Sequence, residues 1–239
     1  MKLEIPSKID ENLAELLGII VGDGYVRTKD PRWLSIEVNA EEKSYIEKHV
    51  IPLVSNIFKC KPVGRFFNRN GINNTYGFYI CSKRLTDFLN YLGVAKKHDK
   101  IRVPEVVIRN KMLYSRFLRG YFDTDGCLSF EKKHKDIYYY PRLLLSSVSK
   151  MLIMDVKGMT DALNICGTVF ITSPGRKTKM PLYRHCIRGP EKLEKWSKRI
   201  GFSNPNSRTK YLIWRKLGHC KTNTSLEKRI SILNNINDL

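Results

Sequence analysis

Two aspartates stand at matching places in a stretch of sequence that occurs twice. Residues 16–24 read Leu-Leu-Gly-Ile-Ile-Val-Gly-Asp-Gly, and residues 118–126 read Leu-Arg-Gly-Tyr-Phe-Asp-Thr-Asp-Gly. Asp23 and Asp125 lie 102 residues apart, and the glycines at the third and last positions keep the same interval. The chain therefore contains an internal repeat with one aspartate near the end of each copy.

Each copy is typical of an apolar helix that ends at its aspartate. The third and seventh positions are small, and positions four apart share one helix face, so two such helices can approach closely. The last glycines, Gly24 and Gly126, suit the left-handed conformation that ends many helices. We therefore expect the two helices to pack together and to end side by side.

An aspartate at a helix C-terminus opposes the helix dipole and is disfavoured by roughly 0.3–1 kcal/mol. Two such carboxylates facing each other also repel. A hard divalent cation, which takes carboxylate, carbonyl and water oxygens, would relieve both problems. Asp-Gly is also a common turn pair, but two copies in register favour a metal site at Asp23 and Asp125, with Gly22 and Thr124 beside them.

The composition favours a nucleic-acid partner. The 239 residues carry 43 basic and 23 acidic side chains, for a formal net charge of +20, and neutralising phosphates would release counterions. An anionic membrane surface is the alternative, but we find no apolar run near the ~20 residues of a spanning helix and no signal peptide. The six cysteines show no zinc-ligand spacing. We expect reduced thiols in an intracellular, cytoplasmic and nucleoid-associated protein.

Hydrophobic periodicity predicts the same order of elements twice. In the first half the predicted segments are a helix ending at Gly24, strands 25–29 and 33–39, a helix 41–58 with a kink at Pro52, strands 61–68 and 75–81, and a helix 83–92. In the second half they are a helix from about 104 to 125, strands 127–133 and 140–147, a helix 149–164, strands 167–172 and 182–188, and a helix 190–200. This order predicts two αββαββα units.

The predicted fold class is α+β, with two pseudo-symmetric units packed through the repeated helices and forming a saddle of two antiparallel sheets. The expected domains are 1–100, the first unit with a basic connector, and 101–204, the second unit. Residues 205–239 form a basic tail, partly helical near 225–233. Because both units stand in one chain, we expect a monomer.

The predicted outward faces of the sheets gather basic side chains. A two-stranded ribbon fits the major groove, where Arg and Lys read guanine and Glu accepts from cytosine. Glu131, between Ser129 and Lys133, is a candidate base reader. Each residue alone is an ordinary surface charge, so the prediction depends on the shared face. The expected DNA contacts are Arg27, Lys29, Arg32, Glu37, Arg65, Arg69, Ser129, Glu131, Lys133, Arg176, Lys177, Lys179, Arg184 and Arg188.

The repeated stretch resembles the signature motif of the LAGLIDADG homing endonucleases in their single-chain, two-motif form, over about residues 10–215. Asp23 and Asp125 fall on the family's metal-binding acidic position. Asp123 matches the family's earlier aspartate in the second motif, whereas Val21 replaces it in the first. The resemblance implies a site-specific endonuclease for intron homing that cuts both strands of a long, asymmetric DNA duplex across the minor groove. It implies Mg²⁺ as cofactor, with Mn²⁺ able to substitute and Ca²⁺ binding without cleavage.

The resemblance also implies basic residues near the scissile phosphates, which would stabilise developing charge. Counting from the glycines that cap the last helix of each unit, Lys100 and Arg208 correspond, and Lys97 and Lys210 are their neighbours. These four are the expected basic catalytic residues. The family often ends its second strand with a water-holding polar residue, for which Asn39 and Ser149 are the nearest matches.

Two other functions agree with the same residues. The first is an RNA maturase that aids intron splicing, which keeps the fold and often both acids, with intron RNA as partner. The second is a non-catalytic DNA-binding regulator, although such proteins tend to have lost one acid, and Asp23 and Asp125 are both present. A protein-splicing element is disfavoured, because residue 1 is Met and the chain ends Asn-Asp-Leu.

Overall fold

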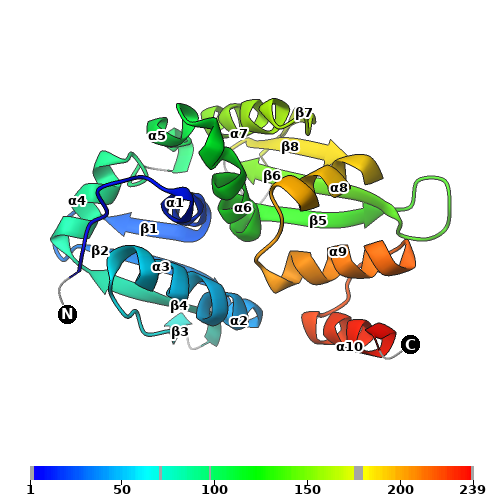
Figure 1. Ribbon diagram of the computed structural model, residues 1–239, viewed down its shortest axis with the longest axis horizontal. Coiled ribbons are helices and arrows are strands. Elements are labelled where there is room, and N and C mark those ends of the chain that lie inside the picture. The colour runs from blue at the N-terminus through cyan, green and yellow to red at the C-terminus, as the bar shows by residue number, and fades with distance from the viewer. Residues whose placement is uncertain (1–2, 70–71, 97, 175–179, 238–239) are drawn as a thin grey trace.

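The two halves of the chain repeat one arrangement around a central pair of helices (Figure 1). The computed structural model describes residues 3–69, 72–96, 98–174 and 180–237. Within them, the first half forms an antiparallel sheet of order β1-β2-β4-β3, and the second half an antiparallel sheet of order β5-β6-β8-β7. The predicted α+β class and the pair of four-stranded sheets are confirmed.

The first half consists of α1 (Glu11–Asp23), β1 (Gly24–Arg27), β2 (Trp33–Asn39), η1 (Ala40–Glu42), α2 (Lys43–Tyr45), η2 (Ile46–Val50), α3 (Ile51–Phe58), β3 (Arg65–Arg69), β4 (Ile72–Cys81) and α4 (Lys83–Tyr91). The second consists of η3 (His98–Lys100), α5 (Glu105–Ile108), η4 (Lys111–Leu113), α6 (Tyr114–Asp125), β5 (Gly126–Glu131), β6 (Tyr140–Ser147), α7 (Lys150–Ala162), β7 (Thr168–Thr172), β8 (Leu182–Arg188) and α8 (Pro190–Arg199). Two more helices follow, α9 (Pro205–Leu217) and α10 (Leu226–Asn237). In the described part of the chain, no helix combines the length and apolar character needed to cross a membrane.

The repeated helices α1 and α6 pack against each other with almost no space between their backbones. A Cβ atom added at Gly18 would lie 2.2 Å from the carbonyl oxygen of Phe117, and one added at Gly120 would lie 2.1 Å from that of Glu15. These distances are far below van der Waals contact. The small residues at the third position of each copy therefore permit the helix pairing, as the spacing predicted.

The glycines that end the two copies have a different role from the predicted one. Gly24 has φ −87° and ψ 146°, and Gly126 has φ −85° and ψ 157°, so both are extended and neither is left-handed. Each helix passes directly into the first strand of its sheet. An added Cβ would lie 2.6 Å from the carbonyl oxygen of Ile20 in one copy and 2.4 Å from that of Phe122 in the other. Glycine is required here by crowding against the last helical turn.

The predicted helix from about 104 to 125 is broken into α5, η4 and α6, which corrects the sequence expectation. Arg109 ends α5, and the side chain of Asn110 accepts a hydrogen bond from the backbone N–H of Met112 at 3.1 Å. This cap begins a new helical segment. The predicted helix 41–58 is helical throughout, but η2, just before Pro52, is π-helical. Proline has no N–H for a helical hydrogen bond, and the wider π turn lies where that bond is missing.

The tail contains more helix than the sequence pattern indicated. Besides α10, residues 205–217 form α9, whose N-cap Asn204 accepts from the backbone N–H of Asn206 at 2.9 Å. The indole of Trp214 stacks on Phe130 of β5 with ring centroids 6.1 Å apart, and its N–H donates to the carbonyl of Tyr139. The basic character of α9 hid its apolar face from the sequence reading. It packs on the second sheet, with α10 beyond it (Figure 1).

Replacing Gly18 with Ala should destabilise the protein by about 2 kcal/mol or more, because the methyl group meets backbone atoms that cannot move aside. Thermal unfolding followed by circular dichroism measures the effect as a fall in Tm. The matched control is Gly158→Ala in α7, where an added Cβ has no atom within 4 Å and should be neutral or slightly stabilising. Equal Tm values for the two variants would contradict this account of the helix pairing.

Candidate functional site

The two repeated aspartates are the last residues of α1 and α6, as predicted. In the last turn of the two helices, Gly22 of α1 lies opposite Thr124 of α6. A Cβ added at Gly22 would be 2.0 Å from Thr124 Oγ1 and 3.6 Å from the carboxyl carbon of Asp125. Asp23 is the next residue along α1. The helix pairing therefore brings two carboxylates and the last-turn carbonyls of both helices to one place.

The electrostatics at Asp23 favour a cation. Burial raises the pKa of Asp23 to about 7 from its ordinary value of 3.8, and the negative charges of Asp125 and Glu42 act in the same direction. At neutral pH the carboxyl group is therefore still partly protonated, because burial and repulsion both disfavour its charged form. A positive ion beside the carboxylates would reverse both effects.

Glu42 is a third carboxyl group near this place, and the sequence reading missed it. It lies in η1, directly after β2, and burial raises its pKa. The side-chain amide of Asn204 donates to Glu42 Oε1 at 2.6 Å, and a hydrogen bond from Asn206 also holds the carboxyl group. Nothing in the spacing of Glu42 pointed to Asp23, because its position depends on the turn after β2 and on a helix about 160 residues away.

Asp123, the additional acid of the second copy, is a structural residue. It is buried, its Oδ2 accepts a hydrogen bond of 2.7 Å from the backbone N–H of Ser203, and its carbonyl oxygen accepts from the amide of Asn204 at 2.8 Å. Burial raises the pKa of Asp123 to about 8. The residue therefore fastens the start of α9 to α6 and does not face the helix ends.

The donor set suits a hard cation that keeps part of its water shell. Within the described ranges, no group of three His, Cys, Asp or Glu side chains could hold a metal ion. Asp23 and Asp125 would offer two carboxylates, and the predicted ligands Gly22 and Thr124 would offer backbone oxygens. Water and an incoming phosphate would supply the remaining ligands, as is usual for Mg²⁺.

Two cavities flank the helix ends, one beside each first strand. A cavity of about 650 Å³ is lined by Val21, Gly24, residues 25–29 and the connector, which contributes Lys96. A cavity of about 320 Å³ is lined by residues 127–130 of β5, together with Lys210 and the tail. Each aspartate thus has, beside the strand that follows it, a cavity with a lysine in its wall.

The four predicted basic catalytic residues have different environments. Burial lowers the pKa of Lys210, which is half-buried and feels the charge of Glu42. Lys100 in η3 and Arg208 in α9 are exposed and are not among the residues that line these two cavities. Lys97 lies outside the described residues, and its neighbour Lys96 lines the first cavity. Lys100 and Arg208 are equally spaced from their capping glycines, but the first lies in a short 3₁₀ segment and the second in a long helix.

The residues expected to hold water serve as helix caps. Asn39 Oδ1 accepts from the backbone N–H of Glu41 at 3.0 Å, and Ser149 Oγ accepts from that of Leu152 at 3.3 Å. Ser149 is also buried and donates to the carbonyl of Ile101 at 2.7 Å.

On the first sheet, the register places Arg27 and Arg65 on the face opposite the core, as predicted. Arg27 pairs with Trp33 across β1 and β2, and its guanidinium lies 4.5 Å from the centre of the indole ring. Arg65 lies over the ring of Tyr79 at 5.5 Å. Glu37 shares this face. Stacking on an aromatic ring holds an arginine in place. Arg27 is also held by its loop, because its Nε donates to the carbonyl of Lys29 and its Nη2 to that of Asp30, each at 3.2 Å.

On the second sheet, Ser129, Glu131, Arg184 and Arg188 share the outward face. Glu131 is held in two ion pairs, with Arg142 at 2.9 Å and Arg188 at 3.4 Å. The predicted base reader is therefore part of a charged cluster, in which Arg142 was missed. Residue 142 has the same parity as the outward positions of β6, a signal available in the sequence.

Several expected DNA contacts lie elsewhere. The strand β1 ends at Arg27 and β5 ends at Glu131, so Lys29 and Lys133 lie in the loops beyond them. Arg32 donates to Asp87 of α4 at 2.6 Å, on the helix side of the sheet, and thus faces away from the outward surface. Arg176, Lys177 and Lys179, like the side chain of Arg69, lie outside the described residues.

Replacing Asp23 with Asn should stabilise the metal-free protein at neutral pH. Because the pKa in the folded state, about 7, stands above the unfolded value of 3.8, the folded protein retains a proton that the unfolded chain has lost. Wild-type stability therefore falls as pH rises from about 4 to about 7. Asn removes that dependence. The free energy of unfolding of the Asn variant should therefore exceed that of the wild type by a margin that grows over this pH window to ~1 kcal/mol or more, roughly 2–4 °C in Tm.

Urea or thermal unfolding in EDTA, at about pH 5 and about pH 8, measures this difference. Glu105→Gln, an exposed carboxyl on α5, is the control and should show a small, pH-independent effect. An Asp23→Asn variant whose advantage is the same at both pH values would contradict the assignment.

Comparisons with known proteins agree with this geometry. Residues 112–201 match the family model described as a LAGLIDADG-like domain. The chain is 32% identical over 151 residues to the replication factor C small subunit of Methanocaldococcus jannaschii, covering 63% of this chain and 7% of that protein. It is 27% identical over 186 residues to the ribonucleoside-diphosphate reductase NrdEB subunit alpha of Bacillus subtilis, covering 73% and 16%. The chain spans less than a fifth of the length of either relative.

Solved structures extend the likeness to both halves. The homing endonuclease I-DmoI, in complex with DNA and Mn, superposes with a TM-score of 0.55 at 18% identity, covering 80% of this chain and 96% of that one. The homing endonuclease I-WcaI, bound to its DNA recognition sequence, gives 0.53 at 16% identity, covering 85% and 84%. Identities this low establish the fold alone. Residues 112–201 therefore match a LAGLIDADG-like domain, and the two halves together have the fold of the solved homing endonucleases I-DmoI and I-WcaI.

Proposed function

We propose that the chain is a site-specific DNA endonuclease that hydrolyses both strands of a long, asymmetric duplex site with a divalent metal. The observation that carries the proposal is the pair of aspartates at the ends of two tightly packed helices, between two sheets with outward arginines. The solved homing endonucleases that share the fold are bound to DNA, with Mn in one structure and Ca in another.

DNA binding is assigned to the outward sheet faces. Arg27 and Arg65 on the first sheet, and Arg188 beside Glu131 on the second, offer N–H groups for phosphates and guanine edges. The two faces carry different side chains, so their recognition sequences should differ. An asymmetric target follows from a chain whose halves diverge in sequence.

The cleavage site is assigned to Asp23 and Asp125, with the carbonyls of Gly22 and Thr124. These residues would hold a divalent cation, which when bound would supply an activated water and charge stabilisation for phosphodiester hydrolysis. Asp23 binds the cation in place of the proton that it otherwise holds near neutral pH. Mg²⁺ is the expected ion, with Mn²⁺ as a substitute and Ca²⁺ supporting binding only.

The lysines in the two cavities are assigned to the scissile phosphates. Lys210 and Lys221 line the cavity beside β5, and Lys29 and Lys96 line the cavity beside β1. We assign Lys210 and Lys96 to the phosphates, one for each strand cut. An ammonium group there stabilises the charge that develops on the phosphate oxygens. Because each unit supplies one aspartate of the paired site, we also propose that a single chain acts as a monomer, with units 1–100 and 101–204 and with Lys210 contributed by the tail.

The named activities of the curated relatives do not transfer to this chain. A replication factor C small subunit, a ribonucleoside-diphosphate reductase subunit and the DNA polymerase of Thermococcus litoralis perform unrelated tasks, yet each shares a segment with it. The shared segment covers 7–16% of each protein. A segment common to unrelated activities is a module with a function of its own.

Asp23→Asn and Asp125→Asn should each abolish double-strand cleavage while DNA binding persists. Each substitution removes one negative charge from the metal site but leaves the outward sheet faces intact. The measurement is cleavage of a randomised DNA library with Mg²⁺, followed by binding to the selected site with Ca²⁺. Glu105→Gln, which alters an exposed acid on α5, should cut like the wild type.

Tight sequence-specific binding without cutting by the wild type would overturn the endonuclease proposal and favour a DNA-binding regulator. If the wild type neither cuts nor selects duplex DNA, the maturase alternative is tested by adding the intron RNA. Splicing that depends on the protein, with no DNA cleavage, would replace the proposal.

Arg27→Ala and Arg65→Ala should weaken DNA binding and make it less sensitive to salt. Each lost phosphate contact lowers the slope of log K against log[salt] by about 0.9. Fluorescence anisotropy at several salt concentrations in Ca²⁺ measures the slope. Arg109→Ala on α5 is the control, because that arginine pairs with Glu105 away from both sheets. A slope lowered equally by all three substitutions would show that the outward face has no special role.

A further inference from the structure

The contact between α1 and α6 is built on a two-fold relation that can be checked residue by residue. Because the copies lie 102 residues apart, every contact across the helix pair has a counterpart in which the two positions exchange roles. Gly18 against the carbonyl of Phe117, at 2.2 Å, and Gly120 against that of Glu15, at 2.1 Å, are such counterparts. Glu15 and Phe117 therefore occupy equivalent places.

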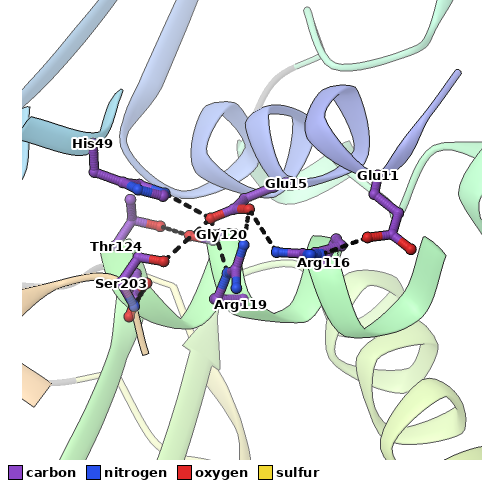
Figure 2. Close-up of polar contacts among 9 residues, drawn as sticks. Glu11, Glu15, His49, Arg116, Arg119, Gly120, Thr124 and Ser203 are labelled. Atoms are coloured by element: carbon purple, nitrogen blue, oxygen red, sulfur yellow. Dashed lines mark hydrogen bonds and ion pairs between the residues drawn. The ribbon is translucent and has the colours of Figure 1, made fainter. Parts of the chain in front are cut away.

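One side of this helix pair is charged (Figure 2). Glu15 of α1 is almost fully buried, with 2% of its side chain exposed, and Arg119 of α6 donates to both of its oxygens, through Nε at 2.9 Å and through Nη2. His49 lies 2.7 Å from the same carboxylate. Arg116 of α6 donates to Glu11 of α1 at 2.8 Å and reaches Glu15 at 3.8 Å.

The electrostatic balance at Glu15 depends on these partners. Burial alone would raise the pKa of Glu15, but hydrogen bonds from His49 and Arg119 and the charge of Arg119 bring it below its ordinary value. The carboxylate is therefore ionised in the interior. Without its cationic partners it would be a buried, uncompensated charge.

The equivalent positions on the other side of the pair are apolar. The counterparts of Glu15 and Arg119 are Phe117 and Leu17, and those of Glu11 and Arg116 are Leu113 and Ala14. All four apolar residues are buried. Both acids thus lie on α1 and both bases on α6.

A second asymmetry is one of size. It lies where two equivalent positions of the repeat contact each other. Gly22 of α1 faces Thr124 of α6, and a Cβ at Gly22 would be 2.0 Å from the threonine hydroxyl. Two glycines could meet at this point, and so can one glycine and one threonine. Two threonines cannot meet without separating the helices. This size match is independent of the ion pairs.

We infer that the helix interface itself determines which half pairs with which: α1 accepts α6 and rejects a second copy of α1, and α6 rejects a second copy of itself. Two α1 helices would bury Glu15 against Leu17 twice, and each carboxylate would keep His49 of its own half but lose both arginines. Two α6 helices would bury Arg119 against Phe117 and would set Thr124 against Thr124. The helix surface that fits α1 thus carries two arginines, at the positions of Arg116 and Arg119, and a residue larger than glycine at the position of Thr124.

The test uses two full-length variants with complementary charges. Glu15→Arg makes both helices basic, and Arg119→Glu makes both acidic. Each alone should lose about 10 °C in Tm or fail to refold, because a buried pair is broken. Refolded together from denaturant, they should form a 1:1 dimer with exchanged halves, since α1 of each then meets a matching α6. Light scattering after size exclusion, with native mass spectrometry, reads out the mass and composition.

The combined variant Glu15→Arg/Arg119→Glu should regain part of the lost Tm within one chain, the remainder being lost to His49 and Arg116 facing a new cation. The matched control is Glu105→Arg mixed with Arg109→Glu, an exposed ion pair on α5, which should unfold like the wild type and form no exchanged dimer. Single variants that keep the wild-type Tm would overturn the inference. So would a rescued combined variant whose parents form no 1:1 dimer.

The size match provides a second arm if the charge variants do not fold in any combination. Gly22→Thr should destabilise the chain, Gly22→Thr/Thr124→Gly should restore it, and Gly22→Thr mixed with Thr124→Gly should give the same 1:1 dimer. Failure of recovery in both arms overturns the inference. None of these readouts uses DNA or metal, so the result is separate from the proposed cleavage.

Discussion

The backbones of α1 and α6 touch at Gly18 and Gly120, and most of the molecule is arranged around that contact. No side chain separates the helices there, so the two helices can end next to each other and their aspartates can share one site. Each helix then passes straight into the first strand of a sheet, with Gly24 or Gly126 crowded against its last turn. A small change in the spacing of the helices would therefore move both acids and both sheets at once.

The same contact places charge where the fold gains nothing from it. Asp23 lies at the negative end of a helix dipole, is buried, and is near Asp125 and Glu42, so its pKa rises to about 7. These features favour a cation at the expense of the stability of the metal-free chain. Glu15 shows the opposite case, because its buried charge is matched by Arg119 and His49 and serves the fold. The two acids lie on one helix, about two turns apart, and only their partners distinguish them.

The sequence was sufficient to predict what depends on periodicity. The repeat, the two sheets, the helix ends at Asp23 and Asp125 and the outward position of Arg27 all follow from spacing along the chain. The sequence was insufficient where contacts between distant residues determine the structure. Asn110 breaks the predicted second helix with a cap, Trp214 gives the basic helix α9 a place on β5, and Glu42 reaches the site through Asn204, far away in sequence. Equal spacing from the capping glycines also did not predict that Lys100 would lie in a short 3₁₀ segment and Arg208 in a long helix.

Asn204 is the last residue of the second unit, 101–204, and its side chain joins both halves. Its side-chain amide donates to Glu42 of the first half and to the backbone of Asp123 in the second. A minimal scaffold trimmed to the two units would keep every strand, both repeated helices and Asn204, but it would lose α9, including Asn206, whose backbone N–H donates to Asn204 Oδ1. The end of the repeat in the sequence is therefore not the end of the part of the chain that holds the two halves together. Grafted or recombined halves should include the first turn of α9.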